Sequence, residues 1–255
     1  TQRDMDRSIT RLSSGLKINT AADDASGFAI AGKMESQIRG LQMNVKNIKD
    51  GKSYVDTMEG ALQEVSALLQ RMRELAVQAS SGVTTATDNG YLQLEMDQLI
   101  SEIDAIADNT KFNGASVLSS GGTVSFFSDV NVAGNTTVVV TSDMHISVLG
   151  VTGNDVSVAT IAMAQSSITN IDAAIAIVDN RRASIGAISN RFHHSIDNLT
   201  NVIANTEAAK SRIIDADYAK ETTALTRNTI LQQAATSMIA QANASKNSIL
   251  SLIAP

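Results

Sequence analysis

A seven-residue repeat of apolar side chains dominates this chain. Between about residues 30 and 79 it forms two rows: Leu41, Ile48, Val55, Leu62, Leu69 and Ala76, and then Met58, Val65, Met72 and Ala79. The single proline is the terminal Pro255, so no interior position forces a helix to break or kink. A repeat sustained over so many heptads predicts a long helix in coiled-coil contact.

The heptads return in the second half of the chain. One row comprises Ala164, Ile171, Val178, Ile185, Phe192, Leu199, Thr206 and Ile213, and a second comprises Ile161, Ile168, Ile175, Ile196 and Ile203. Arg182 and Ser189 occupy positions of the second row and interrupt it with polar groups. A polar position inside such a row is expected to set the register of the helices at some cost in stability.

Two different patterns separate these long helices. After the turn-forming run "SSGVTTATDNG", apolar residues from Leu92 to Ile106 alternate at spacings of four and three, which predicts a second helix and an αα-hairpin. Between about residues 116 and 158 the helical period disappears. The β-branched runs "TVSFF", "TTVVV" and "HISVLGV" predict a few short strands there.

The last helical stretch is built from small residues and amides. One stripe of it, with spacings of four and three, comprises Leu231, Ala235, Met238, Ala242, Ser245, Ile249 and Leu252. Such a stripe buries little apolar area by itself. We therefore interpret it as a self-assembly seam that partners complete, and we expect residues 218–255 to be loosely held in a free monomer.

Composition excludes several classes of function. Cysteine is absent, and the formal charge of −6 is spread without a basic run, which argues against nucleic-acid binding. The sequence contains no run of eighteen apolar residues, so we expect no membrane span. The histidines, His145, His193 and His194, lack the spacing of a metal site, and no catalytic serine motif or phosphate loop is present. We therefore expect no enzyme activity, metal or cofactor.

These patterns together predict a mainly α fold. We expect an elongated antiparallel helical bundle or coiled coil with paired terminal helices and a small β-rich insertion at its tip. Residues 1–24 and 218–255 are assigned to the terminal helices, 25–115 and 159–217 to the bundle, and 116–158 to the insertion.

Several long motifs resemble the conserved ends of bacterial flagellins. The stretches "RLSSGLKINTAADDASGFAIAGKM", "LQRMRELAVQAS" and "TKFNGASVL" resemble the family's N-terminal region. The stretches "SNRF", "SRIIDADYAKET" and "ILQQAATSMIAQAN" resemble its C-terminal region. The resemblance implies a secreted, extracellular filament subunit that polymerises with other flagellin subunits and serves in swimming motility.

The resemblance carries further expectations. It implies an export chaperone and the filament cap and hook-junction proteins as partners. Family members usually carry a further helical stretch, with the export signal, before the position of Thr1. The sequence is interpreted as lacking that stretch.

The resemblance also implies a host Toll-like receptor as a partner. In many flagellins an Arg, a Leu and a Glu contact this receptor, and the motifs "QRMREL" and "LQLEMD" place them at Arg71, Leu75 and Glu95. The alternative interpretation is that Arg71 and Glu95 are solvated or subunit-contact charges and that Leu75 belongs to the core.

Three alternative functions stay open at this point. The nearest is the hook–filament junction protein, which shares terminal helices of this kind. A cell-surface adhesin or glycan-binding protein using the β insertion is another, although Phe126 and Phe127 are the only aromatic residues in "TVSFFSDVNVAGNTTVVV". An enzyme within the middle segment is the third, and the missing motifs argue against it.

Overall fold

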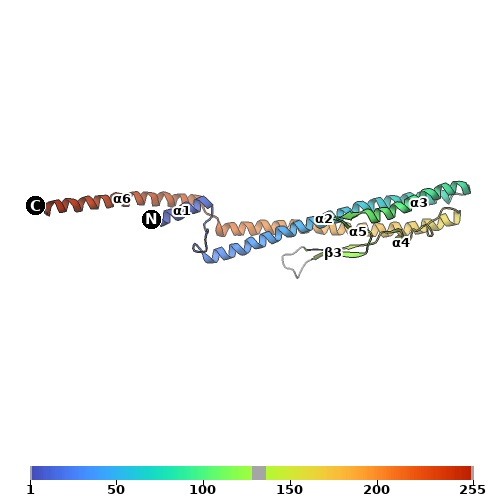
Figure 1. Ribbon diagram of the computed structural model, residues 1–255, viewed down its shortest axis with the longest axis horizontal. Helices are drawn as coiled ribbons and strands as arrows, with labels where there is room; N and C mark the ends of the chain where they lie inside the picture. The colour runs from blue at the N-terminus through green and yellow to red at the C-terminus, as the bar shows by residue number, and fades with distance from the viewer. Residues whose placement is uncertain (1, 128–135, 254–255) are drawn as a thin grey trace. The chain divides into compact units, whose positions relative to one another are not determined.

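The chain forms two compact units in which helices predominate. The computed structural model describes residues 2–127 and 136–253. One unit comprises residues 1–40 and 202–255, and the other comprises residues 41–201. The predominance of helix (Figure 1) confirms the mainly α fold expected from the sequence.

The elements follow one another in a simple order. The helices are α1 (Gln2–Ser14), α2 (Ala25–Ala79), α3 (Ala86–Asn109), α4 (Ile146–Leu149), α5 (Ile161–Ile214) and α6 (Tyr218–Ile253). The strands are β1 (Lys111–Phe112), β2 (Ala115–Ser116), β3 (Gly122–Phe127) and β4 (Thr136–Thr141). Helices α2 and α5 run through both compact units, because the two boundaries fall inside them. The domain boundaries expected at the helix ends stay a prediction.

Both heptad rows of α2 and the first row of α5 form the core of the 41–201 unit, whereas the second row predicted for α5 is exposed at Ile161 and only half-buried at its other isoleucines. Every member of the two rows assigned to α2 is at most 5% exposed. The first row of α5 is buried from Ala164 to Leu199. In Figure 1 the two helices lie side by side along this stretch. The period of seven predicted this contact correctly, because it keeps one stripe of each helix facing the other.

The polar interruption in α5 pairs with α2. The Nε and Nη2 groups of Arg182 both donate to Oε1 of Glu59, at 3.0 and 2.8 Å. Both side chains are about one-third exposed, 33% and 37%. The pair joins one position of α2 to one position of α5, and its role in setting the alignment of the two helices stays a prediction.

Helix α3 folds back beside α2 and completes the predicted αα-hairpin. It begins with a capping box, in which the Thr85 hydroxyl accepts from the Asp88 N–H and the Asp88 carboxylate accepts from the Thr85 N–H. Its buried side chains include Met96, Ile100 and Ile103, so α3 is the third helix that contributes to the core.

The β3–β4 hairpin packs on the side of α2 and α5. The insertion was expected at the tip of the bundle. Instead, the Phe126 ring lies 5.9 Å from both the Tyr54 and the Phe192 rings. A Cβ on Gly51 would come within 2.9 Å of the Phe126 ring, so the glycine makes room for it. Phe126 is thus a packing residue, whereas the side chain of Phe127 lies outside the described part of the chain.

The run "HISVLGV" was expected to be a strand, and that prediction was wrong. It contains α4, which His145 precedes and which Gly150 ends in the left-handed conformation at φ 70°. Asp104 of α3 accepts the Ile146 N–H at 3.0 Å and so caps this helix from outside. The β-branched composition misled the assignment because this distant carboxylate stabilises the helical turn.

A small hairpin was missed altogether. Strands β1 and β2 pair antiparallel, with Asn113 and Gly114 at the turn and both φ angles positive, 50° and 82°. The Asn-Gly dipeptide in "TKFNGAS" is the signal that could have revealed it.

The expectation of no membrane span rested on unbroken apolar runs, and α5 has a higher mean hydropathy than such runs indicate. It contains an eighteen-residue window with a mean hydropathy of 1.4, which is long and apolar enough to cross a membrane by length and composition alone. Part of this hydropathy belongs to the row that packs on α2, which includes Ile171 and Val178. Asp172 between them pairs with Arg73 of α2 at 2.6 Å.

Candidate self-assembly surface

A short backbone contact joins the ends of α1 and α6 in the unit of residues 1–40 and 202–255. Gly15 ends α1 with φ 72°, and its carbonyl accepts the Ala216 N–H at 2.9 Å. The Lys17 N–H donates to the Ile214 carbonyl at 2.6 Å. The segment "IIDADY", which joins α5 to α6, thus pairs with the segment after α1 and places the start of α6 beside the end of α1.

Side chains hold the first turns of α6 to α1. Arg11 and Glu221 form an ion pair of 2.9 Å, with side chains only 22% and 11% exposed. The Tyr218 hydroxyl donates to the Leu12 carbonyl at 2.9 Å. Because higher residue numbers on α1 meet lower numbers on α6, the two helices are antiparallel, as the predicted pairing of the terminal helices required.

Most of α6 beyond these turns presents its side chains to solvent. Leu231, Met238 and Ile239 are 47%, 70% and 61% exposed. Of the predicted seam, Leu231, Ala235, Met238 and Ala242 are all exposed, whereas the side chains of Ile249 and Leu252 lie outside the described part of the chain. The described part of the seam is therefore uncovered within one copy, and its role in self-assembly stays a prediction.

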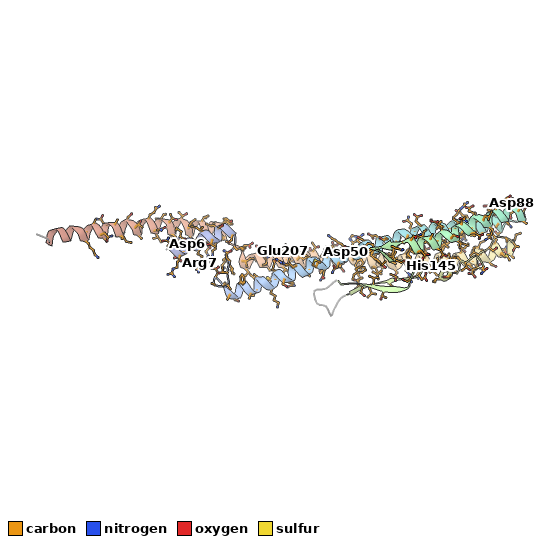
Figure 2. The ribbon with its side chains drawn as sticks, viewed as in Figure 1. Asp6, Arg7, Asp50, Asp88, His145 and Glu207 are labelled. Carbon is orange, nitrogen blue, oxygen red and sulfur yellow. The ribbon has the colours of Figure 1, made fainter. Side chains whose placement is uncertain are left out.

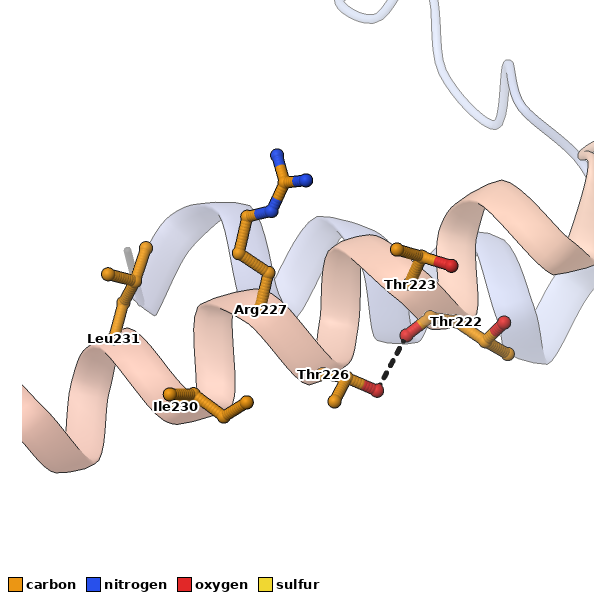
Figure 3. Close-up of a pocket in the computed structure, with 6 residues that line it drawn as sticks. All are labelled: Thr222, Thr223, Thr226, Arg227, Ile230 and Leu231. Carbon is orange, nitrogen blue, oxygen red and sulfur yellow. Dashed lines mark hydrogen bonds between the residues drawn. The ribbon is translucent and has the colours of Figure 1, made fainter.

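The hydroxyl groups on this surface are already bonded within α6. Those of Thr222, Thr226 and Thr229 donate to carbonyl oxygens four residues earlier. Figure 3 shows Thr222 and Thr226 beside Ile230 and Leu231, where they line a shallow groove. Because the hydroxyls are satisfied, covering this surface leaves few unpaired polar groups and exposes methyl groups to the partner.

The residues expected to contact a Toll-like receptor lie in the 41–201 unit. Nε of Arg71 donates to Oε1 of Glu95 across α2 and α3 at 2.9 Å, and Nη1 donates to Glu74 at 3.0 Å. These two contacts, led by that to Glu95, raise the pKa of Arg71. Leu75 is only 1% exposed. The structure thus brings Arg71 and Glu95 together at the surface and places Leu75 in the core.

The histidines are dispersed, and one of them lies among carboxylates. His193 and His194 are exposed on α5. The imidazole ring of His145 (Figure 2) contacts two carboxylates near α4, with Nδ1 2.5 Å from Asp143 and Nε2 3.2 Å from Asp108. Asp143, above all, raises the pKa of His145. Among the described residues, no group of three or more metal-ligating side chains could hold an ion.

Sequence reasoning missed this contact of His145. Asp104 and Asp108 lie four residues apart on α3, a spacing that places both carboxylates on one face. Their partners lie 37 to 42 residues further along the chain, so no local pattern connects them.

Comparison with known proteins matches both ends of the chain. Residues 1–123 match the bacterial flagellin N-terminal helical region, and residues 168–253 match the bacterial flagellin C-terminal helical region. The two matches leave residues 124–167 unmatched and include α1, α2, α3 and α6, together with most of α5.

Individual relatives match over nearly the whole chain. A flagellin of Halalkalibacterium halodurans is 41% identical over 250 residues, covering 97% of this chain and 91% of the relative. Flagellin FlaB1 of Treponema pallidum is 39% identical over 262 residues, with the same two coverages of 97% and 91%.

A solved structure agrees with the sequence matches. The crystal structure of Bacillus cereus flagellin is similar with a TM-score of 0.54 and 34% identity, covering 65% of this chain and 94% of that one. This chain therefore belongs to the bacterial flagellin family and is a non-enzymatic structural subunit of the extracellular flagellar filament.

Proposed function

We propose that copies of this chain polymerise by packing the exposed face of α6 against α1 and α6 of neighbouring copies. The observation that carries this proposal is the exposure of Leu231, Met238 and Ile239 along one helix. Helix α6 has 36 residues and α1 has 13, so α1 can cover only part of its length.

The magnitudes favour contacts with several copies at once. Complete burial of one large apolar side chain contributes about 1.5–3 kcal/mol. Association costs roughly 4–15 kcal/mol in lost freedom and ordering. The burial free energy of a single contact between thin helical faces hardly exceeds this cost. A subunit that is surrounded by neighbours makes several such contacts, so their summed burial free energy exceeds the cost. A filament provides that geometry, because heterologous contacts that do not close can repeat indefinitely.

The proposal is tested by placing a charge on the exposed face. We expect Met238→Asp to abolish filament formation by the full-length protein while the monomer keeps its helical circular dichroism spectrum. Val83→Asp is the matched control, because Val83 is an apolar residue, 88% exposed, in the turn before α3. Normal filaments of Met238→Asp in electron micrographs would contradict the proposal.

We further propose that this chain is recognised by the export chaperone and by the cap and hook-junction proteins. The support is membership of the family together with an apolar α6 surface that a subunit must shield before it polymerises. Co-purification of the unpolymerised chain with its chaperone tests this, and we expect Met238→Asp to weaken that complex.

We also propose that Arg71 and Glu95 contact a host Toll-like receptor. The support is their position: two opposite charges, 49% and 43% exposed, pair across α2 and α3. Leu75 lies beneath them in the core and would act through packing. A reporter-cell assay with monomer tests the assignment. Arg71→Ala is expected to lose most of the signal, with Arg39→Ala as the control for another exposed arginine.

A further inference from the structure

Two opposite charges of the α1·α6 pair are unpartnered within the described part of the chain. Asp6 on α1 (Figure 2) and Arg227 on α6 (Figure 3) are exposed, and neither side chain forms an ion pair or a hydrogen bond. Two other charges of these helices are paired: Arg7 with Asp23, and Arg11 with Glu221.

The two charges lie on faces that cannot meet within one copy. Helix α1 buries Ser8, and Asp6 lies two residues earlier, about 160° around the helix from it. Helix α6 buries Glu221, and Arg227 lies six residues later, about 120° around from it. Each charged side chain therefore lies on a face turned away from the other helix, at the outer surface of the α1·α6 pair.

The two charges nevertheless lie at nearly the same height along the helix pair. Arg11 lies opposite Glu221, and the helices are antiparallel. Position 6 is five residues before Arg11, so it lies opposite position 226, five residues after Glu221. Arg227 is one residue further, a difference of about 1.5 Å. A neighbouring copy displaced sideways would bring its Asp6 close to this Arg227.

Charge composition identifies Asp6 as the carboxylate. Glu221 is the single acidic residue of α6, and it is occupied by Arg11. Helix α1 supplies Asp4 and Asp6, and Asp4 already has an interaction. If α6 packs on α1 and α6 of neighbours, Asp6 is the carboxylate on those helices that remains available to Arg227.

We propose that Asp6 of one copy pairs with Arg227 of the copy beside it. This inference rests on the polymerisation through α6 proposed above, and it specifies how the helices are aligned in that contact. The contact is heterologous, because one copy uses its α1 and the next uses its α6, so it can repeat from subunit to subunit. Ile230 and Leu231 flank Arg227 and exclude water once the groove is covered, which strengthens the attraction.

A charge-swap experiment tests the pair in the full-length protein. Asp6→Arg and Arg227→Glu are each expected to raise the critical concentration for polymerisation roughly tenfold, which is about 1.4 kcal/mol. The double variant Asp6→Arg/Arg227→Glu is expected to polymerise within about threefold of the unchanged protein. Lys220→Glu is the matched control. Lys220 is also exposed on α6, but it lies beside the Arg11–Glu221 pair and therefore not opposite position 6.

The outcomes separate this inference from the one on which it rests. Failure of the unchanged full-length protein to polymerise would overturn both. Normal polymerisation of both single variants would overturn the ion pair and leave assembly through α6 standing. A double variant no better than the single ones, or an equal loss with Lys220→Glu, would also overturn the pairing.

Discussion

The α2·α5 pair and α6 are built from the same kind of repeat, but only the first is complete within one chain. Leu62 and Leu69 of α2 are 0% exposed, whereas Leu231 and Met238 of α6 are 47% and 70% exposed. The first pair supplies both sides of its own interface. Helix α6 exposes one side of an interface, so a helical seam can encode assembly as well as folding.

The largest expected difference between the two regions is in amide exchange of the monomer. Opening free energies range from nearly zero at weakly packed segments to the global value in a core. We expect amides after Leu231 to exchange at close to unprotected rates and those around Leu69 to exchange only through global unfolding. Equal protection of the two segments in a hydrogen–deuterium exchange experiment on monomer would refute the comparison.

A matched pair of truncations sharpens the comparison through stability. Leu62→Ala removes a fully buried side chain and is expected to cost about 2–5 kcal/mol of unfolding free energy. Leu231→Ala is expected to change monomer stability by less than about 0.5 kcal/mol. It should impair polymerisation instead. Urea denaturation and a sedimentation assay distinguish these effects, and a similar loss of stability in both variants would show that α6 is already packed.

Two glycines of α2 differ in the space around them: Gly51 lies against the β3–β4 hairpin, and Gly60 has no neighbouring side chain. Gly51→Ala places a Cβ 2.9 Å from the Phe126 ring, so we expect a loss of roughly 1–3 kcal/mol despite better helix propensity. Gly60→Ala meets nothing within 4 Å and is expected to gain about 0.5–1 kcal/mol. Thermal unfolding measures both, and stabilisation by Gly51→Ala would show that the β3–β4 hairpin does not press on α2.

The smallest expected effect is a pH dependence in the 41–201 unit. The carboxylates of Asp143 and then Asp108 raise the pKa of His145, against the opposing effect of burial. Its stabilising contribution is therefore complete below the unfolded pKa of about 6.5 and is lost as pH rises through the higher folded pKa. Hydrogen bonding by His145 lowers the pKa of Asp143, whose contribution is lost as pH falls through the folded value.

The measurement follows unfolding free energy and the imidazole NMR signal of His145 across this pH range. We expect a decrease of about 1 kcal/mol above neutral pH. His145→Gln should abolish that decrease, whereas His193→Gln, which replaces an exposed histidine, should leave it unchanged. A midpoint for His145 below 6.5 would contradict the assigned role of the two carboxylates.

Local patterns predicted much of the fold because their physics is local. The two rows of α2 and the first row of α5 identified buried faces, and Arg182 was recognised as a polar interruption, but the second row of α5 is not buried. The helical turn of α4 was missed, because Asp104 caps it from a helix 42 residues away. Leu75 illustrates the same limit within a motif, since its neighbours along the chain do not reveal that it is buried.

The sequence by itself determined which faces of the helices are apolar, where the helices are interrupted and to which family the motifs point. Periodicity carries this information because a helix places every seventh residue on the same side. Only the tertiary structure decided which of those faces the chain covers itself. Burial depends on partners distant in sequence: α5 covers Leu62 and its neighbours, while the apolar face of α6 around Met238 remains open. The same arrangement decided that Asp6 and Arg227 lie on faces of α1 and α6 that do not meet within one copy.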